Sequence, residues 1–230
     1  MKKLIENFPN QLREAIEIAN AAKLSPKQDI QNIIITGLGG SGIGGTIISE
    51  LVADTCTVPV FINKDYFLPA FVNNNSLVII SSYSGNTEET LEAMQQALVK
   101  KAQIVCITSG GRVEEIAKQH NIDIIKIPGG NPPRSCIGYS LIQLIKVFVH
   151  YGFAPAILLD DIKNSTSLIV KENITIQTEA KKIAQILLNK IPVIYSLGSC
   201  EGVSVRFRQQ INENSKMLCW HHVFPEMNHN

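Results

Sequence analysis

The sequence has few charged and aromatic residues, and its cysteines form no recognisable framework. Charged residues make up 18% of the 230 positions, aromatic residues make up 6%, and the formal net charge is +1. A nearly neutral chain with scattered basic residues has no electrostatic basis for binding nucleic acid or an anionic membrane. The five cysteines include no CxxC pair, so we expect buried, reduced thiols in a cytoplasmic protein.

Signal and membrane patterns are also absent from the sequence. The segment Met1–Asn7 lacks the apolar core of a signal peptide. The uncharged, apolar-rich stretch from Val147 to Leu159 is shorter than the ~18 residues that a membrane-spanning helix needs. The hydrophobic content of 45% is typical of a globular chain, and the length suffices for one or two domains.

Short apolar runs alternate with helical patterns along the first two thirds of the chain. These runs predict strands at 33–36, 58–62, 77–81, 103–108 and 122–127. The remaining sequence predicts helices at 9–24, 43–53, 88–101, 113–120 and 137–151. Such alternation predicts an α/β fold, in which helices cover both faces of a parallel sheet in a three-layer α-β-α arrangement.

A second, incomplete copy of the same design is predicted near the end of the chain. Residues 160–190 have the pattern of one long helix with a break near 172–174. The run Pro192–Gly198 then repeats the strand-then-glycine layout of Ile33–Gly39, and a helix is predicted over 203–217. Because little sequence follows this copy, we expect the chain to be a fragment of a longer protein.

The segment from Ser82 to Glu89 is the most informative part of the sequence. It joins a predicted strand to a predicted helix, and it carries three hydroxyls (Ser82, Ser84 and Thr87) around Gly85. Hydroxyls beside the free N–H groups of a helix N-terminus favour a site for a phosphate monoester. The alternative is that Asn86 or Thr87 only caps the helix, with Glu89 completing a capping box, which accounts for one side chain of the set.

A glycine-rich segment, residues 37–45, follows the first predicted strand. It matches the G-x-G-x-x-G pattern, but a dinucleotide site expects an acidic residue where Asn63 and Lys64 stand, and the lysine of an NTP-binding loop is absent. We therefore predict a turn at Gly39, Gly40 and Gly42 that lets a ligand approach the backbone, with Ser41 as a donor. Tight helix packing is the alternative reason for these glycines.

Arg134, Glu213 and His229 are the remaining candidates for chemistry. Arg134 precedes a predicted helix and follows two prolines, where it could face an anion or an enolate. Glu213 and His229 could move protons. For each of the three, a solvated surface residue is the alternative. Cys219, His221 and His222 have no third ligand at a familiar spacing, so we predict no metal site.

Together these motifs, in this order, closely resemble the bifunctional phosphoglucose/phosphomannose isomerases of the sugar isomerase (SIS) superfamily, over essentially the whole chain. The resemblance implies two SIS domains, a homodimer and no cofactor. It implies interconversion of glucose 6-phosphate or mannose 6-phosphate with fructose 6-phosphate. We predict a first SIS domain at 1–152, a connecting helix at 153–190 and the start of a second SIS domain at 191–230.

The resemblance also implies a role for each candidate residue. Ser41, Ser82, Ser84 and Thr87 would hold the sugar phosphate, Arg134 would stabilise a cis-enediolate, Glu213 would be the base, and His229 would assist ring opening in the neighbouring subunit. Family members continue beyond the point where this chain stops, so we expect weak or no activity from the chain itself and an exposed apolar sheet face.

Two alternatives to this function stay open. One is a non-catalytic SIS module that binds sugar phosphates, for which Glu213 and His229 would be dispensable. The other is a different SIS enzyme, such as an aminosugar isomerase or an amidotransferase domain. An amidotransferase would require a nucleophilic cysteine near Met1, where the sequence has none.

Overall fold

The computed structural model describes residues 1–229, which form two compact units. Unit 1 covers Met1–Lys163, and unit 2 covers the described residues from Asn164 onward. The boundary lies inside helix α7 (Ile157–Lys171), within the predicted connecting segment. The two units are described separately below.

A five-stranded, fully parallel sheet forms the centre of unit 1. Its order is β2-β1-β3-β4-β5. The strands are β1 (Asn32–Thr36), β2 (Val60–Asn63), β3 (Ser76–Ser82), β4 (Gln103–Thr108) and β5 (Asp123–Lys126). Residues of the central strands β3 and β4 are buried throughout, as expected when helices cover both faces of a parallel sheet.

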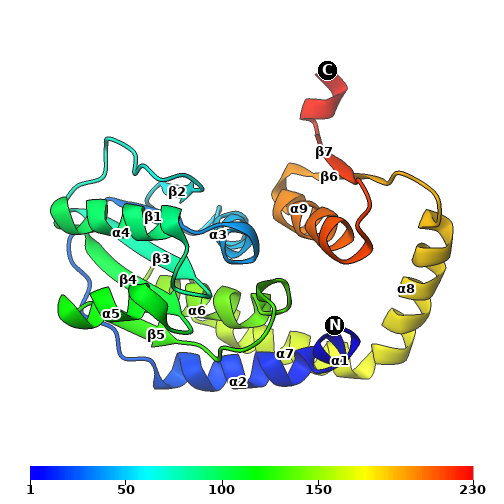
Figure 1. Cartoon of the computed structure of the whole chain (residues 1–230), viewed down its shortest axis with the longest axis horizontal. Helices are drawn as coiled ribbons and strands as arrows, with labels where there is room; N and C mark the ends of the chain where they lie inside the picture. Colours follow the sequence, from blue (N-terminus) through cyan, green and yellow to red (C-terminus); the bar gives the residue numbers. More distant parts are fainter. Residues whose placement is uncertain (230) are drawn as a thin grey trace. The chain divides into compact units, whose positions relative to one another are not determined.

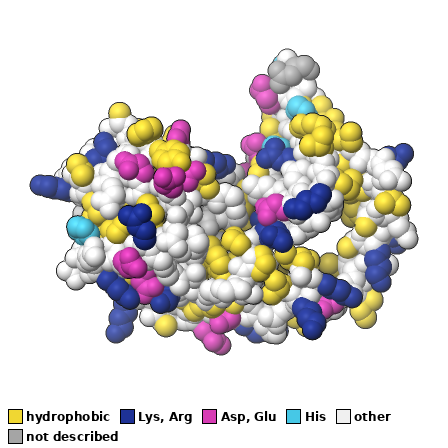
Figure 2. Space-filling model, in the orientation of Figure 1, with side chains coloured by type: hydrophobic (Ala, Val, Ile, Leu, Met, Phe, Trp, Pro, Cys, Tyr) yellow, Lys and Arg dark blue, Asp and Glu magenta, His cyan; other side chains and the backbone are white. Residues whose placement is uncertain are grey.

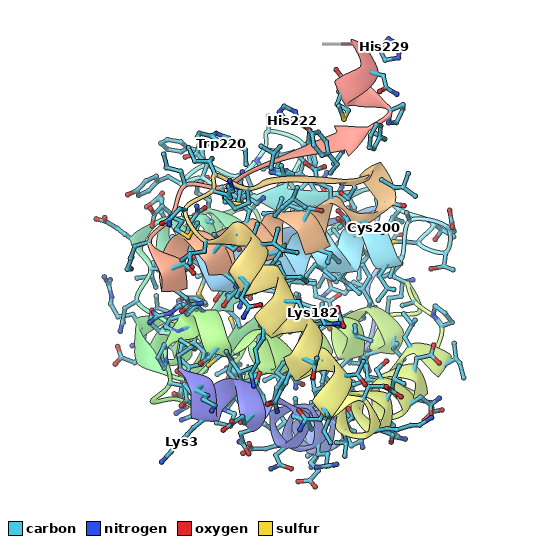
Figure 3. All side chains as sticks on the ribbon, turned by 90° about the vertical axis from the view of Figure 1, so that its right-hand side faces the viewer. Lys3, Lys182, Cys200, Trp220, His222 and His229 are labelled. Carbon is cyan, nitrogen blue, oxygen red and sulfur yellow. The ribbon has the colours of Figure 1, made fainter. Side chains whose placement is uncertain are left out.

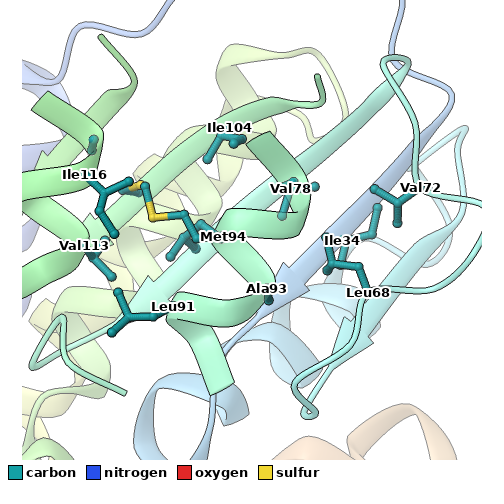
Figure 4. Close-up of a cluster of buried hydrophobic side chains, with 14 residues drawn as sticks. Ile34, Leu68, Val72, Val78, Leu91, Ala93, Met94, Ile104, Val113 and Ile116 are labelled. Carbon is teal, nitrogen blue, oxygen red and sulfur yellow. The ribbon is translucent and has the colours of Figure 1, made fainter. Parts of the chain in front are cut away.

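Helices cover both faces of this sheet (Figure 1). The helices of unit 1 are α1 (Lys2–Glu6), α2 (Phe8–Ala21), α3 (Gly39–Leu51), α4 (Glu88–Val99), α5 (Gly111–Gln119) and α6 (Ile137–His150), with α7 beginning at its end. On one face, Leu91 and Met94 of α4 and Val113 of α5 pack in one core cluster with alternate residues of the strands (Figure 4). On the other face, α3 packs on Ile35 through Gly45, and α6 packs on α3 and α2. The predicted three-layer α/β fold is confirmed.

One helix of unit 1 begins earlier than the sequence predicted. We expected a glycine turn followed by a helix from residue 43, but α3 begins at Gly39 and contains most of the glycine-rich segment. Packing accounts for the difference. A Cβ on Gly42 would lie 2.3 Å from the carbonyl oxygen of Gly37, so only glycine permits the close approach of this helix to the end of β1. Tertiary packing outweighs the low helix propensity of glycine here.

Unit 2 contains a single β-α-β element after a helix. The predicted helix break near residue 172 is confirmed, since α7 ends at Lys171 and α8 covers Asn173–Leu187. Strand β6 (Val193–Leu197) leads to α9 (Glu201–Gln210), a π-helical turn (Ile211–Ser215) and β7 (Trp220–Phe224). β7 pairs in parallel with β6 and was not predicted from the sequence. The predicted helix over 203–217 was too long at its C-terminal end.

The two-stranded sheet of unit 2 has one exposed face. Val193, Tyr195 and Leu197 of β6 are 44%, 54% and 64% exposed, and Trp220 of β7 is 48% exposed. Figure 3 shows Trp220 and His222 projecting from β7 away from α9. The intervening residues of both strands are less exposed. The expected exposed apolar sheet face is therefore confirmed.

The surface and helices add two further observations. On the face drawn in Figure 2, basic and acidic side chains are interspersed on unit 1 rather than gathered into a basic patch. Across residues 1–229, every helix is too short or too polar to cross a membrane.

The core cluster beneath α4 generates a stability prediction. Met94 is fully buried in that cluster, whereas Val99, on the last turn of the same helix, is 83% exposed. Met94→Ala should lower the free energy of unfolding by about 2–5 kcal/mol, because it removes buried atoms and leaves a cavity. Val99→Ala should change it by less than ~0.5 kcal/mol. Urea unfolding measures both, and equal effects would contradict the assigned core.

Candidate functional site

The candidate ligand site of unit 1 lies where β1 and β3 end. β1 continues through α3 to β2 on one side, and β3 lies on the other side of β1. The strand order therefore reverses between β1 and β3. In open parallel sheets, ligands bind beyond the carboxyl ends of the strands at such a switch point. Both motifs singled out from the sequence, the glycine-rich segment and the Ser82–Thr87 turn, start from these two strand ends.

Hydroxyl groups hold the Ser82–Thr87 turn in shape. The buried Ser82 hydroxyl accepts a hydrogen bond from the backbone N–H of Gly85 at 3.2 Å, and it lies 3.1 Å from the Thr87 hydroxyl. Ser84 is exposed, and its oxygen accepts the N–H of Asn86 at 3.2 Å. Ser82 thus forms the base of the turn, and Ser84 and Thr87 lie nearer the solvent.

Gly85 is required at the centre of this turn. Its φ of +68° is in the left-handed region, and a Cβ would lie 1.8 Å from the carbonyl oxygen of Gly110. The carbonyl oxygen of Gly85 also accepts the N–H of Val113 at 3.0 Å. The turn therefore packs directly on the loop between β4 and α5, which fixes its conformation.

The helix cap predicted as an alternative does not form. Thr87 is the N-cap residue of α4 but makes no side-chain capping hydrogen bond. The side chain of Asn86 points elsewhere and accepts the N–H of Arg112 in α5 at 3.1 Å. Capping of α4 therefore does not explain these polar side chains, and the start of α4 offers N–H groups and the positive end of the helix dipole beside two hydroxyls.

Ser41 lies in the first turn of α3 and contacts the Ser82–Thr87 turn. Its buried hydroxyl accepts the backbone N–H of Tyr83 at 3.1 Å. Of the three glycines predicted to form a turn, only Gly39 has a positive φ, +52°. Gly40 packs against the Pro133 carbonyl, 3.0 Å from where its Cβ would lie. Gly42 faces Gly37, so close packing accounts for two of the three.

Arg134 belongs to a short 3₁₀ turn, Pro133–Ser135, next to the same loops. The contact between Gly40 and Pro133 joins this turn to the start of α3. The Tyr83 hydroxyl accepts the N–H of Asn131 at 3.0 Å, which joins the preceding loop to the end of β3. Unit 1 thus brings Ser41, the hydroxyl turn and the Arg134 turn to one edge of its sheet.

Glu213 and His229 belong to unit 2, so the predicted site residues form two sets. Glu213 is half-buried in the π-helical turn after α9, and π-turns occur frequently at functional sites. The turn ends at Lys216 with φ +56°, and the Asn212 side chain donates to the Met217 carbonyl at 2.7 Å. His229 is exposed in a final 3₁₀ turn. The roles of all these residues stay predictions.

One histidine of β7, His221, contacts charged side chains. His221 Nε2 lies 3.3 Å from a Glu201 carboxylate oxygen, and Nδ1 lies 3.2 Å from an Arg208 nitrogen. Because a guanidinium only donates, Nδ1 accepts and Nε2–H donates to Glu201. Among residues 1–229, no group of three His, Cys, Asp or Glu side chains could hold a metal ion.

Three residues of this region escaped the sequence analysis. Tyr83 contacts three neighbouring loops, Ser109 donates its hydroxyl to the Tyr83 carbonyl at 2.6 Å, and Gln11 of α2 donates to the Ser135 carbonyl at 2.9 Å. Only Tyr83 stands inside a recognised motif. Gln11 is 6% exposed, and a buried glutamine on the apolar side of a helix is the one signal that pointed to it.

Comparisons with known proteins agree with this arrangement. A model of the SIS domain matches residues 28–129, and a model of the bacterial phospho-glucose isomerase C-terminal SIS domain matches residues 176–230. The bifunctional phosphoglucose/phosphomannose isomerase of Caldicellulosiruptor bescii is 42% identical over 98% of this chain and 69% of its own length. This chain belongs to the bifunctional phosphoglucose/phosphomannose isomerase family.

Other relatives of this family give the same result. The bifunctional phosphoglucose/phosphomannose isomerase of Thermoplasma acidophilum is 44% identical over 86% of this chain and 60% of its own length. The chain thus spans roughly two thirds of these relatives' length. The C-terminal domain of glucosamine-fructose-6-phosphate aminotransferase from Francisella tularensis shares the fold, with a TM-score of 0.79, 17% identity and coverage of 100% of this chain and 71% of that one. The predicted family of sugar-phosphate isomerases and the predicted fold are confirmed.

Gly85 provides a test of the turn geometry. Gly85→Ala should destabilise unit 1 by clearly more than the ~1–2 kcal/mol that a left-handed alanine costs, because its Cβ also collides with Gly110. Gly152→Ala is the matched control, since Gly152 has φ +73° and no atom lies within 4 Å of the place that a Cβ would take there. Urea unfolding compares the two, and equal losses would contradict the packing of the turn on Gly110.

Proposed function

We propose that the chain carries the site of an aldose-ketose isomerase that interconverts glucose 6-phosphate and mannose 6-phosphate with fructose 6-phosphate. The observation that carries the proposal is the Ser82–Thr87 turn, with its hydroxyls at the uncapped start of α4 and at the switch point of a parallel sheet. Membership of the isomerase family supports it. The chain spans 69% and 60% of the length of two relatives. The activity of a complete family member is therefore assigned to this chain as part of the proposal.

The substrate phosphate binds at the start of α4. Ser84 and Thr87 donate hydroxyl hydrogen bonds to the phosphate, and the α4 N–H groups and helix dipole stabilise its charge. Ser82 and Ser41 also help to hold the phosphate, from the buried side of the turn. Their hydroxyl oxygens accept backbone N–H groups there. A phosphate held in this way fixes the position of the sugar carbons relative to the acid-base groups.

Glu213 transfers the proton between carbons. In the open-chain aldose, its carboxylate removes the C2 proton, and the electron pair moves to the C1 carbonyl oxygen, which gives a cis-enediolate. Glu213 then returns the proton to C1, while the proton of the C2 hydroxyl passes to the C1 oxygen. The Arg134 guanidinium stabilises the negative oxygen of the intermediate. Because the enediolate is the same for both epimers, one site serves glucose and mannose phosphates.

His229 assists sugar-ring opening, and it acts in the site of a neighbouring subunit of a cytoplasmic homodimer. An imidazole has one ring nitrogen that can donate a proton and one that can accept, so it can donate a proton to the ring oxygen and remove one from the C1 hydroxyl. Its exposure in the final 3₁₀ turn of unit 2 suits contact with a second chain.

Exchange of hydrogen with solvent tests the proposed function directly. Fructose 6-phosphate incubated with the purified chain in D₂O should take up deuterium at C1 and yield both aldose phosphates, as followed by NMR, at a low rate because the chain itself is expected to have weak activity. Absence of uptake by a chain shown to be folded would contradict the proposal that these residues suffice for isomerisation.

Glu213→Gln should reduce that exchange by about 10²–10⁴-fold, because the amide cannot act as the base. The affinity for a sugar phosphate should stay unchanged, since Glu213 makes no part of the phosphate site. Glu226→Gln, which removes another carboxylate of unit 2, is the control and should retain exchange. If Glu226→Gln removes exchange and Glu213→Gln does not, the assignment of the base is wrong.

Thr87→Val tests the phosphate site. Loss of a hydroxyl that donates to a charged phosphate should raise the Kd for fructose 6-phosphate about tenfold or more. Thr90→Val is the control, because the Thr90 hydroxyl is buried in the first turn of α4 without a partner among the described residues. Calorimetric titration measures both, and equal affinities in the two variants would argue against phosphate binding at Thr87.

A further inference from the structure

The turn that carries Arg134 is held on both sides by side chains from elsewhere in unit 1. Before the turn, the N–H of Asn131 donates to the Tyr83 hydroxyl at 3.0 Å. At its end, Gln11 of α2 donates from Nε2 to the Ser135 carbonyl at 2.9 Å and accepts the N–H of Gly138 on Oε1 at 3.0 Å. Arg134 lies between these two attachment points, in a turn with no sheet pairing of its own.

Tyr83 connects the Arg134 turn to the hydroxyl turn. Its backbone N–H donates to the Ser41 hydroxyl at 3.1 Å, and its carbonyl accepts the hydroxyl and the N–H of Ser109 at 2.6 and 3.1 Å. The side chain is 9% exposed and reaches Asn131 with its hydroxyl. One residue therefore joins the loops that follow β1, β3, β4 and β5.

The Tyr83 hydroxyl that accepts the Asn131 N–H is uncharged across the physiological pH range. Burial, together with the nearby Cys136 thiol, raises the pKa of Tyr83 to about 12. The phenol therefore stays neutral at physiological pH, and one lone pair of its oxygen accepts the Asn131 N–H.

Gln11 fits its position closely. It is 6% exposed, and both ends of its amide are used by the segment from Ser135 to Gly138. A Cβ on Gly138 would lie 2.6 Å from Gln11 Oε1, so glycine is what allows this amide to reach the start of α6. The amide replaces backbone pairing at the helix N-terminus, where N–H groups have no intrahelical partner.

We propose that Tyr83 and Gln11 are positioning residues that hold Arg134 in place for the negatively charged intermediate. The proposal rests on the proposed isomerase function, in which Arg134 faces the enediolate. It assigns neither residue a contact with the substrate. Their side-chain bonds orient the turn, whereas the phosphate site depends on the backbone and hydroxyls around Ser82.

The test combines hydrogen exchange with binding of two ligands to the full chain. Tyr83→Phe keeps the ring and removes only the oxygen that accepts the Asn131 N–H, and Gln11→Met removes the amide at a similar volume. By NMR, Tyr83→Phe should speed exchange of the Asn131 amide, and Gln11→Met should speed exchange of the Gly138 amide. Both should raise the Kd for D-arabinonate 5-phosphate, whose carboxylate carries charge in the place of the enediolate, about tenfold. The Kd for D-glucitol 6-phosphate, which is uncharged at C1, should stay within about twofold.

Two matched variants control for the loss of a buried hydrogen bond. Tyr151→Phe removes a hydroxyl that accepts from Gln103 at 3.1 Å, at the opposite end of β4. Gln143→Met removes an amide that donates to the Ala15 carbonyl at 2.8 Å between α6 and α2. Both should leave the ratio of the two Kd values unchanged. In an Arg134→Ala background, Tyr83→Phe should no longer alter that ratio, because the two substitutions act through one group.

The outcomes separate this proposal from the proposed function. If the wild-type chain binds neither ligand, the proposed sugar-phosphate site is wrong, and the positioning role is overturned with it. If the wild type binds both ligands and Tyr83→Phe weakens both equally or neither, the positioning role alone is overturned. A change in the ratio that persists in the Arg134→Ala background would also overturn it, since the effect would not pass through Arg134.

Discussion

The parallel pairing of β1 with β3 is the constraint on which the candidate site depends. The two strands are neighbours, but their connections lead to opposite sides of the sheet, so the loops beyond their carboxyl ends meet with no strand between them. The hydrogen bond in which the buried Ser41 hydroxyl accepts the Tyr83 N–H joins these two loops directly. Strands this apolar hold their register through packing on both faces, and that register places the polar loops.

Polar groups at the candidate site hold its loops together, and the proposed function assigns the same groups to the ligand. The Ser82 oxygen closes the turn by accepting the Gly85 N–H, and the same hydroxyl lies within hydrogen-bond distance of the Thr87 hydroxyl, at 3.1 Å. Backbone N–H groups buried near the turn need partners, and short hydroxyl side chains supply them in little space. A turn held by its own hydrogen bonds needs little further ordering if a phosphate binds there as proposed.

The sequence predicted the elements whose signal is local and missed those that depend on packing. The β-branched run Ile33–Ile35 was recognisable because a strand buried on both faces is a continuous apolar run. Helix α4 was recognisable because a helix buried on one face has apolar residues at a helical period. β7 was missed because two histidines interrupt its apolar pattern, and its pairing with β6 decides its conformation. The early start of α3 was missed because glycine propensity opposes a helix there. The Gln11 contact joins positions 124 residues apart, which no local pattern reports.

The grouping of the candidate residues into two units has a chemical consequence. Arg134 and the hydroxyls proposed to bind phosphate belong to a unit with a five-stranded sheet, whereas Glu213 belongs to a unit in which the described residues form one β-α-β element. A base can act only when it is held to within a fraction of an ångström of the carbon acid, whereas a phosphate anchor works wherever its own donors are rigid. In the proposed function, phosphate affinity follows the integrity of unit 1, and proton transfer also requires Glu213 of unit 2. Binding and turnover consequently respond to different parts of the chain, which makes the two separable by substitution within one protein.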